Sequence, residues 1–118
     1  MLDAGIEPEL RQRHLQVVDG CRASLGLDIG PVVTTEEPLE INLDLGSNGT
    51  SWGGIAQPEV LLDAGETLKA QGFSAIAVVT RFPNELDIET LTEYRQGRGV
   101  DLLAGAEAVI SHLLVRHL

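Results

Sequence analysis

The sequence predicts an α/β fold, in which a small and mostly parallel sheet is flanked by helices to give three layers. Two observations predict it. A helical apolar stripe over residues 58–70 is followed by Gly72 and then by an unbroken apolar run at residues 75–79. A strand without a polar side is typical of a parallel sheet that is covered on both faces. The shortness of the run, and the flanking Gly72 and Pro83, favour a strand over a buried helical segment.

The length of 118 residues allows a single domain, which we expect to span residues 1–118. Hydrophobic residues make up 43% of the chain but aromatic residues only 3%. The core must therefore be built from aliphatic side chains, many of them small.

The chain carries 18 acidic and 8 basic residues, a formal net charge of −10. Such a surface repels phosphate groups and anionic lipids, so we expect neither a nucleic-acid partner nor a membrane partner. The single cysteine, Cys21, cannot form an internal disulfide, and no signal sequence is visible, which together indicate a cytoplasmic protein. We find no metal-ligand spacing and expect neither a metal nor another cofactor.

The first expected helix begins at Pro8 and ends at Gly26. Its apolar face recurs at three- and four-residue spacing: Leu10, His14, Val17, Val18, Cys21 and Leu25. We interpret His14 as a histidine at the edge of the core, and not as a metal ligand.

Residues 39–45 alternate strictly between apolar and polar side chains, which predicts a strand with one solvent-facing side. That side carries Glu40, Asn42 and Asp44. The two carboxylates are either a solvated face that discourages edge-to-edge pairing or a site for a cation or for acid–base chemistry.

Residues 46–54 form a glycine-rich stretch that also holds the only tryptophan, Trp52. We expect a loop here, because it matches neither a P-loop nor a dinucleotide fingerprint. Glycine lets backbone N–H groups approach a ligand, and short polar side chains can bind an anion. The ligand-binding hypothesis uses Ser47, Asn48, Thr50, Ser51 and Trp52; the alternative is a surface connector.

The helix over residues 58–70 has Pro58 at its first position and Gly72 just beyond its end, where a left-handed residue is expected. Arg81 follows the expected central strand. Ligands of open α/β sheets bind at the carboxyl ends of the strands. We therefore expect Arg81 to bind an anionic group with its planar guanidinium.

Asn84 and Asp87 predict the start of a third helix, which has Leu86 on its apolar face and ends at Gly97. The last helix is expected from Leu102 to about residue 117.

This last helix is apolar almost all round, so it must be buried on every side. A chain this small cannot cover it alone, and we expect a second copy or other polypeptide to do so. Glu107 and His112 interrupt its apolar surface and are weak candidates for acid–base chemistry.

Several segments together resemble a family of proteins of unknown function, DUF3326, from cyanobacteria, other bacteria and plant plastids. They are LDAGIEPELRQRHLQVVDGCRASLG, LLDAGETL, SWGG, AIAVVTRFP and GVDLLAGAEAVISHLLVR. The resemblance covers nearly the whole chain. It implies no particular reaction. It also implies a considerably longer family protein, of which this sequence is similar to an interior portion.

Two functional hypotheses follow. The first is a module that binds a small anionic ligand between the 47–54 loop and Arg81, and that contributes to an enzyme site. The second is a structural module that forms homo-oligomers through the C-terminal helix.

Overall fold

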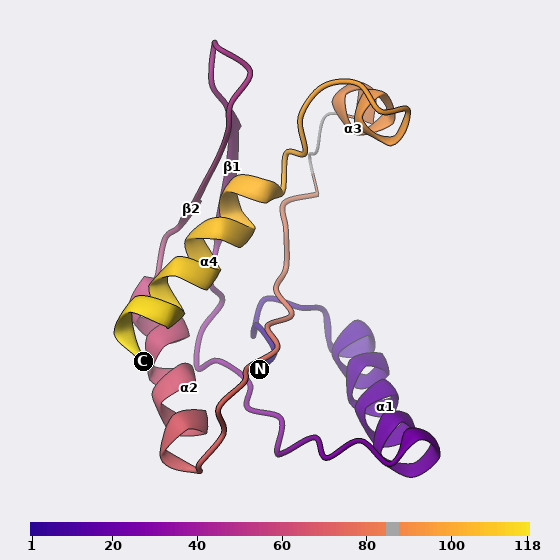
Figure 1. Ribbon diagram of the computed structural model, residues 1–118, viewed down its shortest axis with the longest axis vertical. Coiled ribbons are helices and arrows are strands. Elements are labelled where there is room, and N and C mark those ends of the chain that lie inside the picture. The colour runs from indigo at the N-terminus through magenta and orange to yellow at the C-terminus, as the bar shows by residue number, and fades with distance from the viewer. Residues whose placement is uncertain (85–87) are drawn as a thin grey trace.

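A computed structural model describes residues 1–84 and 88–118 (Figure 1). Over these residues the chain forms four helices and two strands. Their order is α1 (Pro8–Leu25), β1 (Ile41–Leu45), β2 (Ser51–Ile55), α2 (Pro58–Ala70), α3 (Ile88–Arg95) and α4 (Ala104–His117).

Strands β1 and β2 form an antiparallel hairpin, with a register that runs from Ile41 opposite Ile55 to Leu45 opposite Ser51. The alternation of residues 39–45 thus correctly predicted a strand. The expected loop at residues 46–54 is wrong in its second half, which is β2. The backbone N–H of Gly46 donates to the carbonyl of Thr50 at 2.8 Å, and Gly49 has a φ of +76° that suits glycine.

The predicted parallel, three-layer sheet is wrong. The one sheet among the described residues is the two-stranded antiparallel hairpin. The run at residues 75–79 forms no regular strand; it makes one isolated parallel bridge, between Val79 and Leu2. Leu2 makes a second parallel bridge to Thr34. An apolar run of this kind is typical of a strand inside a parallel sheet, with neighbouring strands along both edges. In the described part of this chain only a short N-terminal segment pairs with the run, so no sheet forms there.

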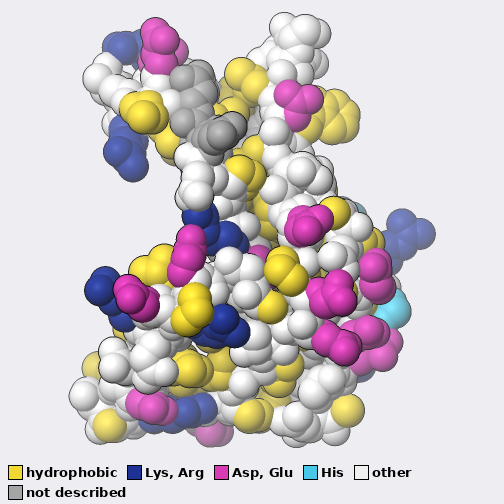
Figure 2. Space-filling model, turned by 180° about the vertical axis from the view of Figure 1, so that it is seen from behind, with side chains coloured by type: hydrophobic (Ala, Val, Ile, Leu, Met, Phe, Trp, Pro, Cys, Tyr) yellow, Lys and Arg dark blue, Asp and Glu magenta, His cyan; other side chains and the backbone are white. Residues whose placement is uncertain are grey.

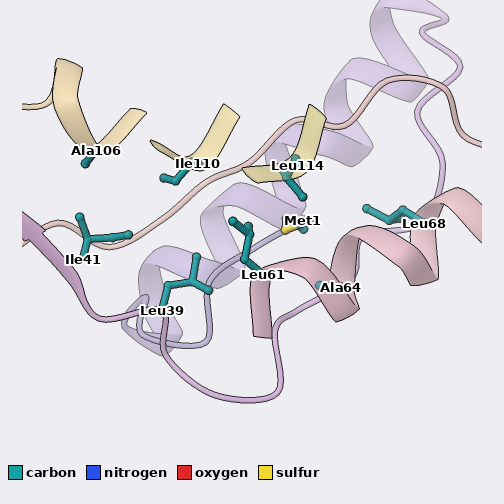
Figure 3. Close-up of a cluster of buried hydrophobic side chains, with 9 residues drawn as sticks. All are labelled: Met1, Leu39, Ile41, Leu61, Ala64, Leu68, Ala106, Ile110 and Leu114. Carbon is teal, nitrogen blue, oxygen red and sulfur yellow. The ribbon is translucent and has the colours of Figure 1, made fainter. Parts of the chain in front are cut away.

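The core lies where α4 crosses the hairpin and α2. Figure 3 shows the α4 side chains pointing toward those of α2, with Leu39 and Ile41 at one side of the cluster. Leu39 and Leu61 have no exposed surface. The buried cluster is Met1, Leu39, Ile41, Leu61, Ala64, Leu68, Ala106, Ile110 and Leu114, so it is aliphatic as the composition predicts.

The first turn of α4 lies directly on the backbone of β2. A Cβ atom on Gly53 would be 2.1 Å from the backbone nitrogen of Ala106, and one on Gly105 would be 2.6 Å from the carbonyl carbon of Trp52. These two glycines therefore allow helix and strand to approach closely. By contrast, a Cβ atom on Gly54 would meet no atom within 4 Å.

Helix α2 confirms its sequence prediction at both ends. Pro58 is the first residue, and Gly72 has a φ of +91°. The N–H of Phe73 donates back to the carbonyl of Leu68 at 3.3 Å. The buried face of the helix is formed by Leu61, Ala64, Gly65 and Leu68.

Helix α1 projects away from the core (Figure 1). No residue of α1 is buried, although the sequence predicts an apolar face. Val17 is 62% exposed and Leu25 is 67% exposed. The end of the helix is attached to the following loop by Arg22, whose Nε donates to the carbonyl of Ile29 at 2.9 Å.

Helix α3 forms as predicted and ends before Gly97. The predicted capping-box residue Asp87 and the apolar Leu86 lie outside the described residues. Helix α4 begins at Ala104, two residues later than predicted, and the carboxylate of Asp101 accepts a hydrogen bond from the N–H of Leu103 at 2.9 Å.

Helix α4 buries three residues, Ala106, Ile110 and Leu114. Burial on every side, as the sequence predicts, is not reached within this chain, because Val115 is 84% exposed.

Figure 2 shows the opposite side of the molecule, where acidic side chains gather along one flank of the lower half.

Candidate functional site

The carboxylate of Asp3 is the polar centre of the molecule, and Asp3 is only 1% exposed. Its Oδ1 accepts hydrogen bonds from the N–H groups of Gly5 (2.8 Å) and Leu39 (3.1 Å). Its Oδ2 accepts from the Oγ1 of Thr80 (2.7 Å) and the N–H of Arg81 (3.0 Å). One side chain thus joins the N-terminal segment, the start of the hairpin and the chain that follows the apolar run.

Burial of the Asp3 carboxyl by itself raises its pKa. The hydrogen bonds from Arg81, Gly5, Thr80 and Leu39 outweigh this effect and hold the pKa below its ordinary value of 3.8. The group is therefore ionised near neutral pH and has four donors. A carboxylate in this state stabilises the fold and is a poor proton donor or acceptor.

The guanidinium of Arg81 is fixed by three neighbours. Its Nε donates to the Oε1 of Glu7 at 2.8 Å, and its two terminal nitrogens donate to the carbonyl of Phe82 and the side-chain oxygen of Asn84. The Arg81 side chain is 30% exposed. Because a guanidinium has five N–H donors, two remain for another acceptor.

Arg81 lines a hollow of about 440 Å³. The remaining walls come from the N-terminal segment, the start of β1 and the chain after Arg81: Asp3, Gly5, Glu7, Pro38, Glu40, Ile41, Phe82, Pro83 and Asn84. Of the three carboxylates among these residues, Asp3 accepts four hydrogen bonds and Glu7 accepts from Arg81 itself, whereas Glu40 is exposed. Glu40 adopts a φ of +51°, which is uncommon for a residue with a side chain.

A larger hollow, of about 670 Å³, lies between α4 and residues 74–82. Helix α4 contributes Glu107, Ile110, Ser111, Leu114 and Val115, and the facing chain contributes Ser74, Ile76, Val78, Val79, Thr80 and Phe82; Leu118 closes the end. Glu107 is the charged side chain among these residues. We name this hollow the α4 groove.

The residues predicted to bind a ligand from the 46–54 stretch lie in the hairpin. Ser47, Asn48 and Thr50 form its turn, where the side-chain oxygen of Asn48 accepts from the N–H of Thr50 at 3.1 Å. The Oγ of Ser51 donates to the carbonyl of Leu102 (3.0 Å) and accepts from the N–H of Gly105 (3.1 Å). Trp52 is 60% exposed.

The structure does not bring this hairpin stretch together with Arg81. Neither hollow described above is lined by residues 46–54. The hairpin tip projects from the body of the molecule (Figure 1). Binding by these five side chains stays a prediction, and Ser51 has a structural role beside α4.

The two acid–base candidates of α4 lie apart. Glu107 lines the α4 groove, whereas His112 is exposed and does not line it. Within residues 1–84 and 88–118, no group of three His, Cys, Asp or Glu side chains can bind a metal ion.

The sequence did not lead us to predict that Asp3 is a buried polar centre of the fold. One local signal was present, because an aspartate whose carboxylate accepts from the N–H two residues later is a common turn, and Gly5 lies at that position. The other three donors lie 36, 77 and 78 residues away in the sequence, so no local pattern reveals them.

The fold and the cluster around Asp3 define a small α+β module with a structural polar centre and an apolar groove beside its last helix. The chain belongs to the family described as "Protein of unknown function (DUF3326)", whose model matches residues 1–118. The resemblance seen in the sequence is thus confirmed.

One relative is an uncharacterised lipoprotein of Synechococcus sp. (strain ATCC 27144 / PCC 6301 / SAUG 1402/1), which is 52% identical over 116 residues. The match covers 98% of this chain and 32% of the relative, so the chain spans about a third of that protein's length. No solved structure matches the chain. None of the described helices is both long and apolar enough to cross a bilayer.

Proposed function

We propose that this chain is a structural assembly module that forms homo-oligomers through its C-terminal helix. The observation that carries the proposal is the apolar surface left open beside α4. Val115 is 84% exposed at the border of the α4 groove, whose walls are mostly aliphatic. Exposed apolar patches of this kind mark sites of protein association.

The energetics favour covering this surface. Each Å² of apolar surface removed from water contributes about 25 cal/mol, so burial of a Val or Leu side chain contributes about 1.5–3 kcal/mol. The net charge of −10 of the whole chain works against association. The α4 groove has Glu107 as its one charged lining side chain among the described residues, so a second copy meets little repulsion there.

A pair of matched substitutions on α4 tests the proposal. Val115 lines the groove, whereas Ala108 is exposed on the same helix and does not line it. We expect Val115→Lys to shift the oligomer toward monomer in sedimentation velocity, and Ala108→Lys to leave it unchanged. Equal effects of both substitutions, or of neither, would contradict assembly through the groove.

A second function, binding of a small anionic ligand, is favoured by one observation. Arg81 faces the 440 Å³ hollow with two N–H donors unused and with its orientation fixed by Glu7 and Asn84. We propose that these donors bind a carboxylate or phosphate, with Asn84 as a neighbouring polar group.

This binding is tested by titrating inorganic phosphate and citrate into the purified chain and following the amide resonances of Arg81, Phe82 and Asn84 by NMR. Saturable shifts that disappear in Arg81→Gln, and persist in the exposed control Lys69→Gln, support the site. Shifts that do not saturate contradict it.

We also propose a cytoplasmic location, which is supported by the single cysteine, Cys21, because it has no partner for an internal disulfide. The Synechococcus relative has the word lipoprotein in its name, which would instead favour attachment to a membrane. Fractionation of cells that express the chain from its own gene decides between the two. Recovery with the membranes after a high-salt wash contradicts the cytoplasmic location.

A further inference from the structure

We propose that residues 76–80 present an open strand edge, and that this edge pairs in antiparallel fashion with the same edge of a second copy. The inference rests on the proposed self-association and specifies its geometry. It concerns the backbone of the apolar run, whereas the proposed function concerns the side chains of α4.

The inner edge of this run is already paired. The N–H of Val79 donates to the carbonyl of Met1 (3.1 Å), and the carbonyl of Val79 accepts from the N–H of Asp3 (2.9 Å). The carbonyl of Ala77 accepts from the nitrogen of Met1 at 2.6 Å. The odd-numbered residues of the run therefore direct their backbone groups toward the N-terminal segment.

The outer edge is formed by the even-numbered residues Ile76, Val78 and Thr80. Among the described residues, none provides a hydrogen-bond partner for the backbone N–H or carbonyl groups of Ile76 and Val78. Backbone groups of successive residues in an extended chain alternate in direction, so these groups point away from Leu2. A row of unpaired groups on an extended segment is a template for another strand.

The surroundings of this edge suit an added strand. The side chains of Ile76, Val78 and Thr80 all line the α4 groove, as do Ile110 and Leu114 of α4. A strand paired at the usual spacing of about 4.8 Å would place its alternate side chains over the same groove. Backbone pairing and apolar burial would therefore occur together.

Charge favours a second copy as the occupant. Residues 74–80 contain no charged side chain, although the whole chain carries a net charge of −10. Like charges directly opposite one another across two strands are destabilising. Two copies that meet along this edge avoid this, because the edge has no charged side chain. An antiparallel pair of identical strands is self-complementary and closes as a two-fold dimer, so it leaves no further edge of this run open.

Self-pairing also sets the register. With the two-fold axis at Val78, this residue lies opposite its own copy, and Ile76 lies opposite Thr80 of the second copy. Both pairings place β-branched side chains together, which is favourable across strands. Directly opposite residues in a hydrogen-bonded antiparallel pair have Cα atoms about 5.5 Å apart, which falls within the range of roughly 4.4–6.8 Å that a disulfide spans.

The test is disulfide cross-linking of the full chain. In a Cys21→Ser background, Val78→Cys should form a covalent dimer under mild oxidation, at several times the rate of Ala75→Cys. The control Ala75 lies on the same run and is exposed, but the register places its two copies far apart. Hydrogen exchange should show the amides of Ile76, Val78 and Thr80 slowed only at concentrations where the dimer forms.

The experiments give different results if the edge pairing is wrong and if the proposed assembly through α4 is wrong. A dimer that is lost in Val115→Lys, but shows equal cross-linking at positions 78 and 75, overturns the edge pairing and leaves assembly through α4 intact. A chain that remains monomeric overturns both. Slow exchange at Ile76 and Val78 already present in the monomer also overturns the edge pairing.

Discussion

Replacement of Asp3 by asparagine tests the structural role of the buried carboxylate. The amide oxygen can still accept from Gly5 and Leu39, but the amide nitrogen takes the place of Oδ2 and faces the N–H of Arg81. A buried donor without an acceptor costs about 1–3 kcal/mol, and hydrogen bonds to a charged acceptor contribute about 1.5–3 kcal/mol each. The Thr80 hydroxyl can rotate and accept instead. We therefore expect Asp3→Asn to lower the free energy of unfolding by about 2–3 kcal/mol.

The measurement is equilibrium unfolding in urea, followed by far-ultraviolet circular dichroism at a fixed protein concentration. Asp28→Asn is the matched control, because Asp28 is exposed and its change should stay within about 0.5 kcal/mol. Oligomeric state must be the same for all variants, since association contributes to apparent stability. A loss of less than about 0.5 kcal/mol for Asp3→Asn would refute the view that its four hydrogen bonds organise the fold.

Three further predictions follow from the same structure. Gly53→Ala should lower stability by about 1–3 kcal/mol through overpacking, since its Cβ would meet the α4 backbone; Gly54→Ala, which meets no neighbour, should change urea unfolding little. The pKa of the Asp3 carboxyl is lower in the folded than in the unfolded state, so its ionisation stabilises the fold above the unfolded-state pKa of about 4. This stabilisation is lost as the pH falls through the lowered folded-state pKa. Acid unfolding of Asp3→Asn should therefore lack this loss of stability. Thr35→Val should destabilise the fold by about 1–3 kcal/mol, because Thr35 Oγ1 accepts from the N–H of Ala4 and donates to the carbonyl of Glu37; a thermal midpoint equal to that of the parent would contradict this.

The features that the sequence predicted correctly are local ones. Pro58 and Gly72 bound α2 because their backbone preferences act within one turn, and the alternation of residues 39–45 identified β1. The start of α4 was predicted within two residues. In each case the residues that decide the structure lie next to each other in the chain.

The features that were wrong depend on partners distant in the sequence. The apolar run at residues 75–79 has the composition of a buried parallel strand, but its pairing requires neighbours, and only Leu2 lies beside it. The glycines of residues 46–54 suggested a ligand loop; Gly53 instead allows α4 to pack on β2. Neither outcome can be deduced from residue spacing, because both depend on which segment packs opposite.

The candidate site shows the same division. The sequence predicted that Arg81 binds an anionic group beside residues 47–54, and this binding stays a prediction. The structure places Arg81 at a hollow that those residues do not line, with Glu7, 74 residues away in the sequence, as its partner. Glu107, a weak candidate for acid–base chemistry in the sequence, lines the α4 groove, and its role in such chemistry stays a prediction. A buried, saturated carboxylate such as Asp3 is invisible until the fold is known.

The most direct test of assembly through the C-terminal helix is the solution mass of the unmodified 118-residue chain, measured by light scattering over a range of concentrations. The formula mass is 12.6 kDa. We predict a closed dimer, with a mass that reaches a plateau at twice this value. A mass that stays at that of the single chain at every concentration would contradict the proposal.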